Sequence, residues 1–262
     1  MRIPGKVCLI TGAAQGIGAA TATALAARGA RLALCDLKAD AVGDLAERLP
    51  GDHLAAGLDV LDDDAVGSFL EKVRSRSGRI GVLVNNAGIG APRSVDDLDV
   101  ETWQKTLDVN LTAPFRLVKA TLDDLRATRG QIATVASMAA RIHPPLLGHY
   151  SATKAGVAAF AETLRVELAC DGIGVTTVYF GTIDTPLLAN GLADPLVTDR
   201  MRKRVETARR LGVSPLVRVE SAGEAIAAAI EHRRRHVILP RRARLAFYAQ
   251  APFQRLVART TR

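Results

Sequence analysis

The chain has 262 residues, of which 48% are hydrophobic and 24% are charged. This length and balance predict one large α/β domain with an apolar core over residues 1–262, and they exclude a disordered, collagenous or coiled-coil protein. The formal net charge of +8 is local, because residues 232–262 hold nine arginines and no acidic residue. The rest of the chain is nearly neutral, so we expect no nucleic-acid partner.

Targeting segments are not predicted. The start of the chain lacks the apolar region of a signal peptide, and the longest apolar stretches are far shorter than a membrane span. Three cysteines, Cys8, Cys35 and Cys170, are far apart and odd in number. This pattern favours reduced, buried thiols over disulfides or a metal site, and with them a cytoplasmic location.

Strand-like and helix-like segments alternate along the chain. The expected strands are residues 7–10, 31–35, 53–58, 81–85, 131–136, 173–180 and 236–239, and the expected helices are residues 16–28, 38–49, 62–77, 101–127, 150–169 and 221–231. This alternation predicts right-handed crossovers and a parallel sheet with helices on both faces. We interpret the long connection at residues 186–215 as a lid over a substrate site.

A glycine-rich turn, Thr11 to Gly18, joins the first strand to the first helix. Glycines let the backbone approach a pyrophosphate closely, and a helix N-terminus offers free N–H groups and a positive dipole end. Asp36 closes the second strand, where its carboxylate can accept hydrogen bonds from an adenosine ribose. The alternative is that Asp36 caps the next helix.

Further motifs follow this turn in a fixed order. They are Asp59-Val60, Asn85-Asn86-Ala87-Gly88, Asn110, Ser137 and Tyr150-Ser151-Ala152-Thr153-Lys154. In this ordered set the chain resembles a classical short-chain dehydrogenase/reductase over nearly its whole length, up to about residue 240. The resemblance implies a Rossmann-type doubly wound α/β fold with a seven-stranded, mainly parallel sheet in the order 3-2-1-4-5-6-7. It also implies a homodimer or homotetramer, which we expect to assemble through the helices at 101–127 and 150–169.

The same resemblance implies a nicotinamide dinucleotide cofactor. NAD is expected over NADP, because Asp36 would repel a 2′-phosphate and both Gln15 and Leu37 are uncharged. Lys38 is a nearby cation, but it comes one residue after the position at which NADP-dependent members of the family have a base. The expected cofactor-binding residues are Gly12, Gln15, Gly16, Ile17, Gly18, Asp36, Leu37, Asp59, Val60, Asn86, Ala87, Gly88, Tyr150, Lys154, Gly181, Ile183 and Thr185.

Tyr150 and Lys154 are four residues apart in a predicted helix, so both side chains point from one face. A tyrosine pKa of about 10 is too high for acid–base chemistry at neutral pH, and a nearby ammonium lowers it. Tyr150 can then exchange the hydroxyl proton of an alcohol, while Ser137 at the end of a strand holds the substrate oxygen. The alternative, a surface Tyr–Lys pair, is disfavoured by Ser137 and the glycine turn.

Asn110 completes the predicted catalytic set. Pro114 lacks the N–H that would bond the Asn110 carbonyl, so the helix should kink and leave that carbonyl free. The resemblance implies that Asn110 holds a water in a proton relay, and a simple kink is the alternative. Phe180 stands where the family usually has proline, so it either stacks on the cofactor ring or fills the core.

The expected substrate wall is mostly apolar, which favours a hydrophobic alcohol or ketone. It includes Met138, His143, Leu147 and Leu187. A structural role for His143 is at least as well supported, and no histidine has companions at metal-ligand spacing, so we expect no metal. Arg93 and Arg141 could meet an acidic group or simply face water.

The last segment, residues 241–262, is basic and amphipathic and is expected to be a helical extension. It packs on its own domain or a sister subunit, caps the substrate cleft, or makes peripheral contact with an anionic membrane.

Three functions are compatible with these patterns. The first is an NAD(H)-dependent oxidoreductase for a hydrophobic secondary alcohol or its ketone. The second is a 3-oxoacyl-carrier-protein reductase that uses NADPH. The third is a nucleotide-binding scaffold without turnover, which the intact Ser137, Tyr150 and Lys154 disfavour.

Overall fold

The computed structural model describes residues 1–199, 202–203, 206–207, 215–240 and 242–248. Within these residues one seven-stranded sheet has the order β3-β2-β1-β4-β5-β6-β7, and every neighbouring pair is parallel. The predicted strand order is therefore confirmed. The strands are β1 (Val7–Thr11), β2 (Arg31–Asp36), β3 (Leu54–Gly57), β4 (Ile80–Asn85), β5 (Gln131–Val135), β6 (Gly174–Phe180) and β7 (His236–Leu239).

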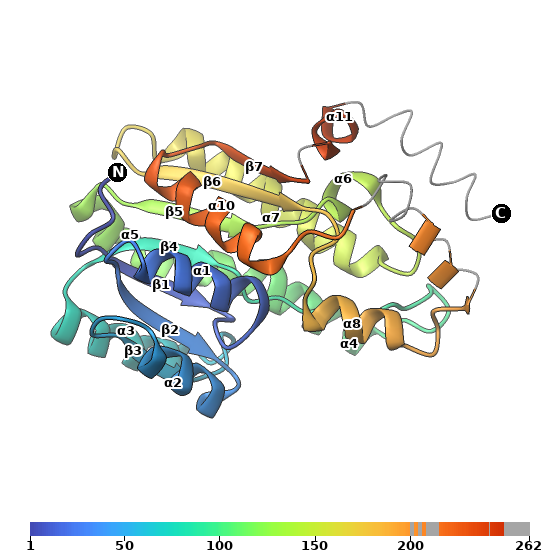
Figure 1. Ribbon diagram of the computed structural model, residues 1–262, viewed down its shortest axis with the longest axis horizontal. Coiled ribbons are helices and arrows are strands. Elements are labelled where there is room, and N and C mark those ends of the chain that lie inside the picture. The colour runs from blue at the N-terminus through green and yellow to red at the C-terminus, as the bar shows by residue number, and fades with distance from the viewer. Residues whose placement is uncertain (200–201, 204–205, 208–214, 241, 249–262) are drawn as a thin grey trace.

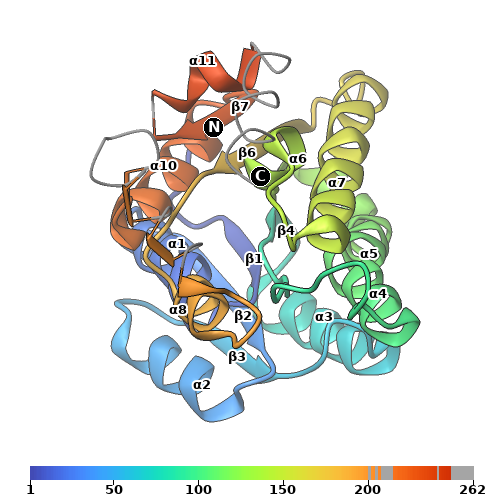
Figure 2. The ribbon, with the colours of Figure 1, turned by 90° about the vertical axis from the view of Figure 1, so that its right-hand side faces the viewer.

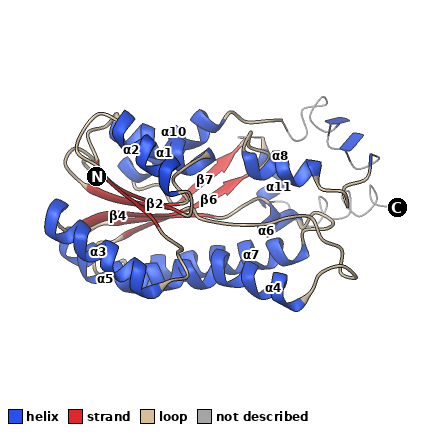
Figure 3. Ribbon diagram, turned by 90° about the horizontal axis from the view of Figure 1, so that it is seen from below, coloured by secondary structure: helices blue, strands red, loops and turns tan. Residues whose placement is uncertain are grey.

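Two layers of helices enclose the sheet (Figure 3). One face is covered by α1 (Gly16–Ala26), α2 (Ala39–Arg48) and α10 (Val219–Glu231), and the other by α3 (Asp63–Ser77), α5 (Ala113–Thr128) and α7 (Gly148–Glu167). The central strands β1, β4 and β5 are consequently buried on both faces, while the edge strand β3 is only partly buried. This explains why the strands are nearly continuous apolar runs rather than alternating ones.

Short helices gather at the carboxyl ends of the strands. They are α4 (Val100–Leu107), α6 (Ala139–Ile142), α8 (Pro186–Ala193) and α11 (Ala243–Tyr248). Figure 2 faces this end of the molecule, which is also where the glycine-rich turn leaves β1. In open parallel sheets ligands bind outside this edge, so the fold positions a candidate site here.

The helix predicted at 101–127 is interrupted. A π-helical segment, η1 (Asp108–Thr112), separates α4 from α5, and the Ala113 N–H bonds the Asp108 carbonyl across five residues. Pro114 lies in the first turn of α5, which continues from η1 without a break because Thr112 is itself helical. The kink predicted near Asn110 therefore takes the form of a widened turn.

The described part of the C-terminal extension is α11. Its Phe247 ring lies 4.6 Å from the Tyr179 ring on β6, edge to face, and 4.9 Å from the guanidinium of Arg141 on α6. Among the described residues no helix has both the length and the apolarity to cross a membrane. Residues 241 and 249–262 of the predicted extension, and residues 200–201, 204–205 and 208–214 of the predicted lid, lie outside the described residues.

The cysteine prediction is partly wrong. Cys8 and Cys35 are buried in β1 and β2, and burial raises the pKa of each thiol to about 12. Cys170 is exposed instead, in the turn that follows α7. The sequence around Cys170 is a helix end, and the prediction overlooked that such ends lie at the surface.

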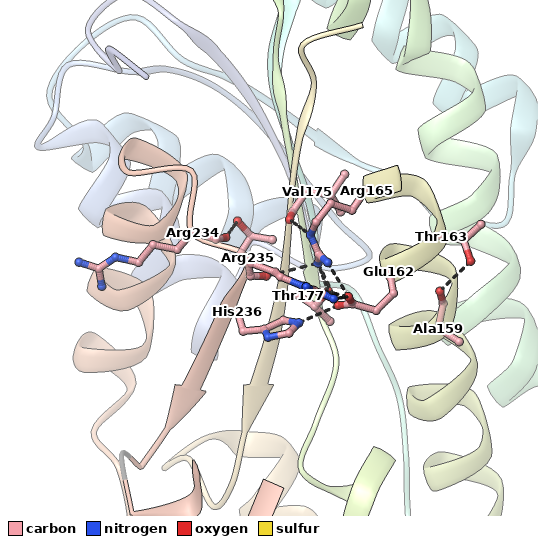
Figure 4. A network of polar contacts seen from close by, with 10 residues as sticks. Ala159, Glu162, Thr163, Arg165, Val175, Thr177, Arg234, Arg235 and His236 are labelled. Atoms are coloured by element: carbon pink, nitrogen blue, oxygen red, sulfur yellow. Dashed lines mark hydrogen bonds and ion pairs between the residues drawn. The ribbon is translucent and has the colours of Figure 1, made fainter. Parts of the chain in front are cut away.

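A polar network fastens α7 to the sheet (Figure 4). The Glu162 carboxylate accepts hydrogen bonds from Arg235 (2.8 Å), His236 (2.8 Å) and Thr177 (3.1 Å), and it pairs with Arg165 on its own helix. Burial acts to raise the pKa of Glu162, but the hydrogen bonds from Arg165, Arg235 and His236 together lower it. Glu162 therefore keeps its negative charge, and its contacts hold α7 against β6 and β7.

Candidate active site

The glycine-rich turn packs directly on the segment after β4. Gly12 has a φ of +64°, and a Cβ there would lie 2.9 Å from the Ala87 Cα. A Cβ on Gly18 would collide with the carbonyl oxygen of Gly12. Glycine is thus required at both positions, because any side chain would push the two segments apart.

Hydrogen bonds join the same two segments. Thr11 Oγ1 accepts from the N–H groups of Asn86 (3.1 Å) and Ala87 (3.0 Å). The Asn86 side chain donates to the carbonyls of Thr11 and Gly12, at 2.9 Å each. The turn and the Asn86–Gly88 motif therefore form one unit at the start of α1, where free N–H groups can receive phosphate oxygens.

Asp36 closes β2 beside this turn. Its Oδ2 accepts from the Ala14 N–H and its Oδ1 from the Lys38 N–H, both at 3.0 Å. Each carboxylate oxygen has a further lone pair, so ribose binding and the turn into α2 are compatible. The Lys38 ammonium is held by Gln15 Oε1 at 2.7 Å, and Leu37 is 72% exposed.

The segment after β6 also reaches the glycine-rich turn. A Cβ on Gly16 would lie 3.5 Å from Thr185 Cγ2, which is ordinary contact distance. Thr185 is the N-cap of α8, and its hydroxyl accepts from the Leu188 N–H at 3.3 Å. The Gly181 N–H donates to the Leu239 carbonyl, and Ile183 is buried. The structure therefore brings Gly16 and Thr185 together.

Two predicted residues lie further along this edge. Asp59 turns the chain after β3, where its Oδ1 accepts from the Leu61 N–H at 2.9 Å, and Val60 is buried. Phe180 is also buried, in the apolar cluster under α1 and α10. Of the two alternatives for Phe180, the structure supports the one in which it fills the core.

Lys154 is buried at the sheet edge. Its side chain lies on α7, with Nζ 5.6 Å from the centre of the Tyr150 ring, and Nζ donates to the Val135 carbonyl at 2.9 Å. Burial lowers the pKa of this ammonium to about 8. Lys154 therefore holds a proton that it can release near neutral pH, which an exposed lysine cannot do.

Tyr150 is hydrogen-bonded to Ser137. Burial of its phenol raises the pKa, and the Ser137 hydrogen bond lowers it by less. The prediction that Lys154 lowers the pKa of Tyr150 is therefore not supported, because burial and Ser137 account for the shift. Ser137 Oγ also accepts from the Ala139 N–H at 3.1 Å, which fixes this hydroxyl at the start of α6.

Asn110 is 1% exposed and sits in the π-helical segment. Its Nδ2 donates to the Ile89 carbonyl and its Oδ1 accepts from the Ile89 N–H, both at 2.8 Å. Nδ2 also donates to Thr153 Oγ1 at 3.1 Å. A Cβ on Gly88 would lie 3.2 Å from both Asn110 Oδ1 and Lys154 Nζ. The amide of Asn110 and the ammonium of Lys154 therefore both lie next to the backbone at Gly88.

The predicted substrate residues differ in exposure. Met138 is buried, Leu187 on α8 is 42% exposed, and Leu147 pairs with Arg93 in an isolated β-bridge. His143 lies at the end of α6, where its Nδ1 is 3.1 Å from the Ala139 carbonyl. This contact supports the structural alternative for His143.

Sequence reasoning missed a link between the substrate wall and α8. Arg93 pairs with Asp194 at 2.9 Å, just after α8 ends, and its backbone N–H donates to the Leu146 carbonyl. Arg141, the other arginine considered for an acidic group, lies instead against the rings of Tyr179 and Phe247. The partners in each of these contacts are far apart in the sequence, so no local sequence pattern predicts the contacts.

Lys154→Met is expected to remove a pH dependence of stability. The pKa of Lys154 is about 8 in the folded protein against 10.5 for an ordinary lysine, so the unfolded state binds more protons between these values. The free energy of unfolding of the unmodified protein should therefore rise relative to the variant, by up to about 3 kcal/mol, as pH increases through this window. Denaturant titrations of both proteins across the window measure the difference.

Comparing the unfolding free energies of the two proteins also removes the contributions of other titrating groups. Cys8 and Cys35 lose their protons above their usual pH in both proteins, so their contributions cancel. A stability difference that stays constant from pH 8 to pH 10.5 would contradict burial of the Lys154 ammonium.

Comparisons with known proteins cover most of the chain. The profile of the family described as short chain dehydrogenase matches residues 6–195. The cis-4-hydroxycyclohexanecarboxylate dehydrogenase of Sinomonas cyclohexanicum is 37% identical over 227 residues, or 85% of this chain and 88% of that protein. The 3-oxoacyl-(acyl-carrier-protein) reductase of Thermotoga maritima is 39% identical over 191 residues, or 71% of this chain and 78% of that protein.

A solved structure is also similar. The crystal structure of 3-ketoacyl-(acyl-carrier-protein) reductase from Brucella melitensis complexed with NADH superposes with a TM-score of 0.80. The sequences are 25% identical, and the match covers 90% of this chain and 97% of that chain. The similarity therefore includes the sheet and the edge at which the candidate site lies.

Proposed function

The chain belongs to the short-chain dehydrogenase family, and from this we propose that it is an NAD(H)-dependent oxidoreductase that interconverts a hydrophobic secondary alcohol and its ketone. Membership makes it an oxidoreductase of CH–OH groups with a nicotinamide acceptor; the choice of NAD and the substrate are the proposal. The observation that carries it is the grouping of Ser137, Tyr150 and Lys154, with Lys154 Nζ next to Gly88 in the segment that packs on the glycine-rich turn.

A dinucleotide fits the residues present. Gly12 and Gly18 leave no room for a Cβ, and the start of α1 offers N–H groups to a pyrophosphate. Asp36 would accept hydrogen bonds from the ribose, and Lys154 would hold the ribose hydroxyls nearer the reacting centre. When bound, this cofactor supplies hydride acceptance or donation.

The chain's own residues handle the proton and the substrate oxygen. The Ser137 hydroxyl would orient the oxygen, and the Tyr150 phenol would exchange the proton with it. The phenol is protonated at neutral pH, because its ordinary pKa is about 10 and burial raises the pKa further, and a protonated phenol suits donation to a ketone. In the opposite direction the phenol would take part after losing its proton, and the Asn110 carbonyl is proposed to connect Lys154 to solvent as part of a proton relay.

Two relatives direct the choice of substrates. The Sinomonas relative is named for a cyclic secondary alcohol that also carries a carboxylate, and the ring of that alcohol agrees with the apolar wall proposed around Met138 and Leu147. The Thermotoga relative and the Brucella structure favour the second candidate, an acyl-carrier-protein reductase. Asp36 disfavours the NADPH that such a reductase would use. Assays of cyclic alcohols, linear alcohols and 3-oxoacyl thioesters with both cofactors separate these candidates.

Several domain-level expectations remain proposals. The chain is proposed as one domain, with residues 186–215 as a substrate lid and residues 241–262 as a C-terminal extension. The ion pair between Arg93 and Asp194 supports the lid, since it links α8 to the wall of the site. A cytoplasmic location also stays a prediction.

Phe115→Asp is expected to reduce the size of a homo-oligomer. Phe115 on α5 is 49% exposed, and its ring meets Phe160 on α7 edge to face at 6.0 Å. This leaves an apolar surface on the two helices proposed for assembly, and a carboxylate there would be costly to bury. Light scattering should give a smaller particle for this variant, and an unchanged one for Leu37→Asp on another exposed surface.

Small residues on α7 do not by themselves provide a surface for a second subunit. A Cβ on Gly156 would lie 3.1 Å from Leu111 Cδ2 of the same chain, so this position faces η1. Ala158 is buried as well. A monomer at working concentration for the unmodified protein would remove the assembly proposal.

A further inference from the structure

Thr153 lies between Tyr150 and Lys154 on the first turns of α7 and is fully buried. Its hydroxyl donates to the Tyr150 carbonyl at 2.8 Å and accepts from Asn110 Nδ2 at 3.1 Å. The hydroxyl therefore uses its one donor on the catalytic turn and one of its two acceptor lone pairs on the π-helical segment.

The donation to Tyr150 alone would be unremarkable. Thr121 on α5 makes the same kind of bond to the Leu117 carbonyl, at 2.7 Å, and is equally buried. Such bonds satisfy a hydroxyl within its own helix. Thr153 differs because its second bond reaches a buried side chain that is 43 residues away and lies on another element.

Asn110 extends this link to the loop after β4. Its amide bonds both backbone groups of Ile89, so Thr153, Asn110 and Ile89 form a continuous chain of hydrogen bonds. The next residue, Gly90, passes close over the Tyr150 ring, since a Cβ there would lie 2.5 Å from Tyr150 Cδ2. The loop that covers the phenol is therefore tied to the same turn that presents it.

Loss of the Thr153 hydroxyl would leave one Nδ2 proton of Asn110 without its partner in a buried setting. An unpartnered buried donor is costly, and the segments around it shift to find a new partner. Movement of η1 or of the Ile89–Gly90 loop relative to α7 would change the distance between the phenol and a bound substrate.

We propose that Thr153 is a positioning residue, whose hydroxyl fixes the Tyr150–Lys154 turn against Asn110 and the Ile89–Gly90 loop. The inference rests on the proposed function, because it assigns Thr153 a part in placing the phenol that transfers the proton. Small displacements of catalytic groups have large kinetic effects, whereas the cofactor contacts of the glycine turn lie elsewhere.

The test uses Thr153→Val, which keeps the shape and removes the hydroxyl, and Thr153→Ser, which restores the hydroxyl. On the substrate found in the assays, Thr153→Val should lower kcat by about tenfold and leave the KM for NAD within about twofold. Thr153→Ser should keep kcat within about twofold of the unmodified protein. The matched control is Thr121→Val, which loses a buried threonine hydroxyl far along α5 and should retain kcat.

Equal kcat values for Thr153→Val and Thr121→Val would overturn the proposal, as would failure of Thr153→Ser to restore turnover. If Tyr150→Phe also keeps full turnover, the proposed function itself fails; if Tyr150→Phe is inactive, only the role of Thr153 fails. Amide hydrogen exchange provides a readout independent of substrate. The Ile89 N–H should exchange at least about threefold faster in Thr153→Val than in Thr121→Val, and equal protection would overturn the proposal.

If Thr153→Val does not fold, Thr153→Ala replaces it in the same measurements. This variant also removes the hydroxyl, and it leaves a small space in place of a methyl group. The same fall in kcat and the same faster exchange at Ile89 are expected, and their absence contradicts the role of the hydroxyl.

Discussion

Replacement of Tyr150 by phenylalanine is expected to lower kcat by about 10²- to 10⁴-fold, while the Kd for NADH changes by less than about twofold. The substitution removes the phenolic proton and leaves the ring that packs under Gly90. The proposed nucleotide contacts of Gly12, Gly18 and Asp36 are untouched. Steady-state assays give kcat, and fluorescence titration with NADH gives the Kd.

Tyr179→Phe is the matched control for this result. Tyr179 is fully buried, and it lies in the aromatic cluster with His236 and Phe247 rather than at the candidate site. It should keep kcat within about threefold. Near-normal turnover by a folded Tyr150→Phe protein would remove the catalytic assignment.

The second large effect concerns the cofactor. The unmodified protein should have a higher kcat/KM with NAD than with NADP, because a 2′-phosphate would lie against the Asp36 carboxylate. The double variant Asp36→Ala, Leu37→Arg replaces repulsion by a cation at an exposed position. We expect the NAD/NADP ratio of kcat/KM to fall by about 100-fold, equivalent to about 2.7 kcal/mol.

Lys38 is the control for the cofactor experiment. Its ammonium is engaged by Gln15 Oε1, so Lys38→Ala should leave the preference of the unmodified protein for NAD in place. A preference of the unmodified protein for NADP that disappears in Lys38→Ala would show that this base overrides the Asp36 carboxylate.

The sheet and its order could be predicted because the signals are local and ordered. Apolar runs such as Val7 to Ile10 end at turns, and each is followed by a helical segment. The short helices α6 and α8 were not predicted individually, because four to eight residues are too few for a helical period to show. Pro114 indicated an interruption near Asn110, but not that it would be π-helical.

Some features of the candidate site could likewise be predicted from local sequence, and others could not. The spacing of Tyr150 and Lys154 placed both on one helix face, and the structure brings them together as expected. The roles of Thr153 and Arg93 depend on partners far along the chain, Asn110 and Asp194, which only the tertiary fold brings close. The pKa of Tyr150 was predicted in the wrong direction, since spacing reveals a neighbouring charge but not the extent of burial.

The most direct measurement is reduction of NAD by the purified protein in the presence of a panel of cyclic and linear secondary alcohols, with the corresponding ketones and NADH for the reverse direction. Absorbance of the reduced nicotinamide reports turnover. The proposed function predicts turnover of at least one hydrophobic alcohol–ketone pair, greater kcat/KM with NAD than with NADP, and loss of turnover in Tyr150→Phe. Absence of turnover with either cofactor in both directions, by a folded protein that binds NADH, would contradict it.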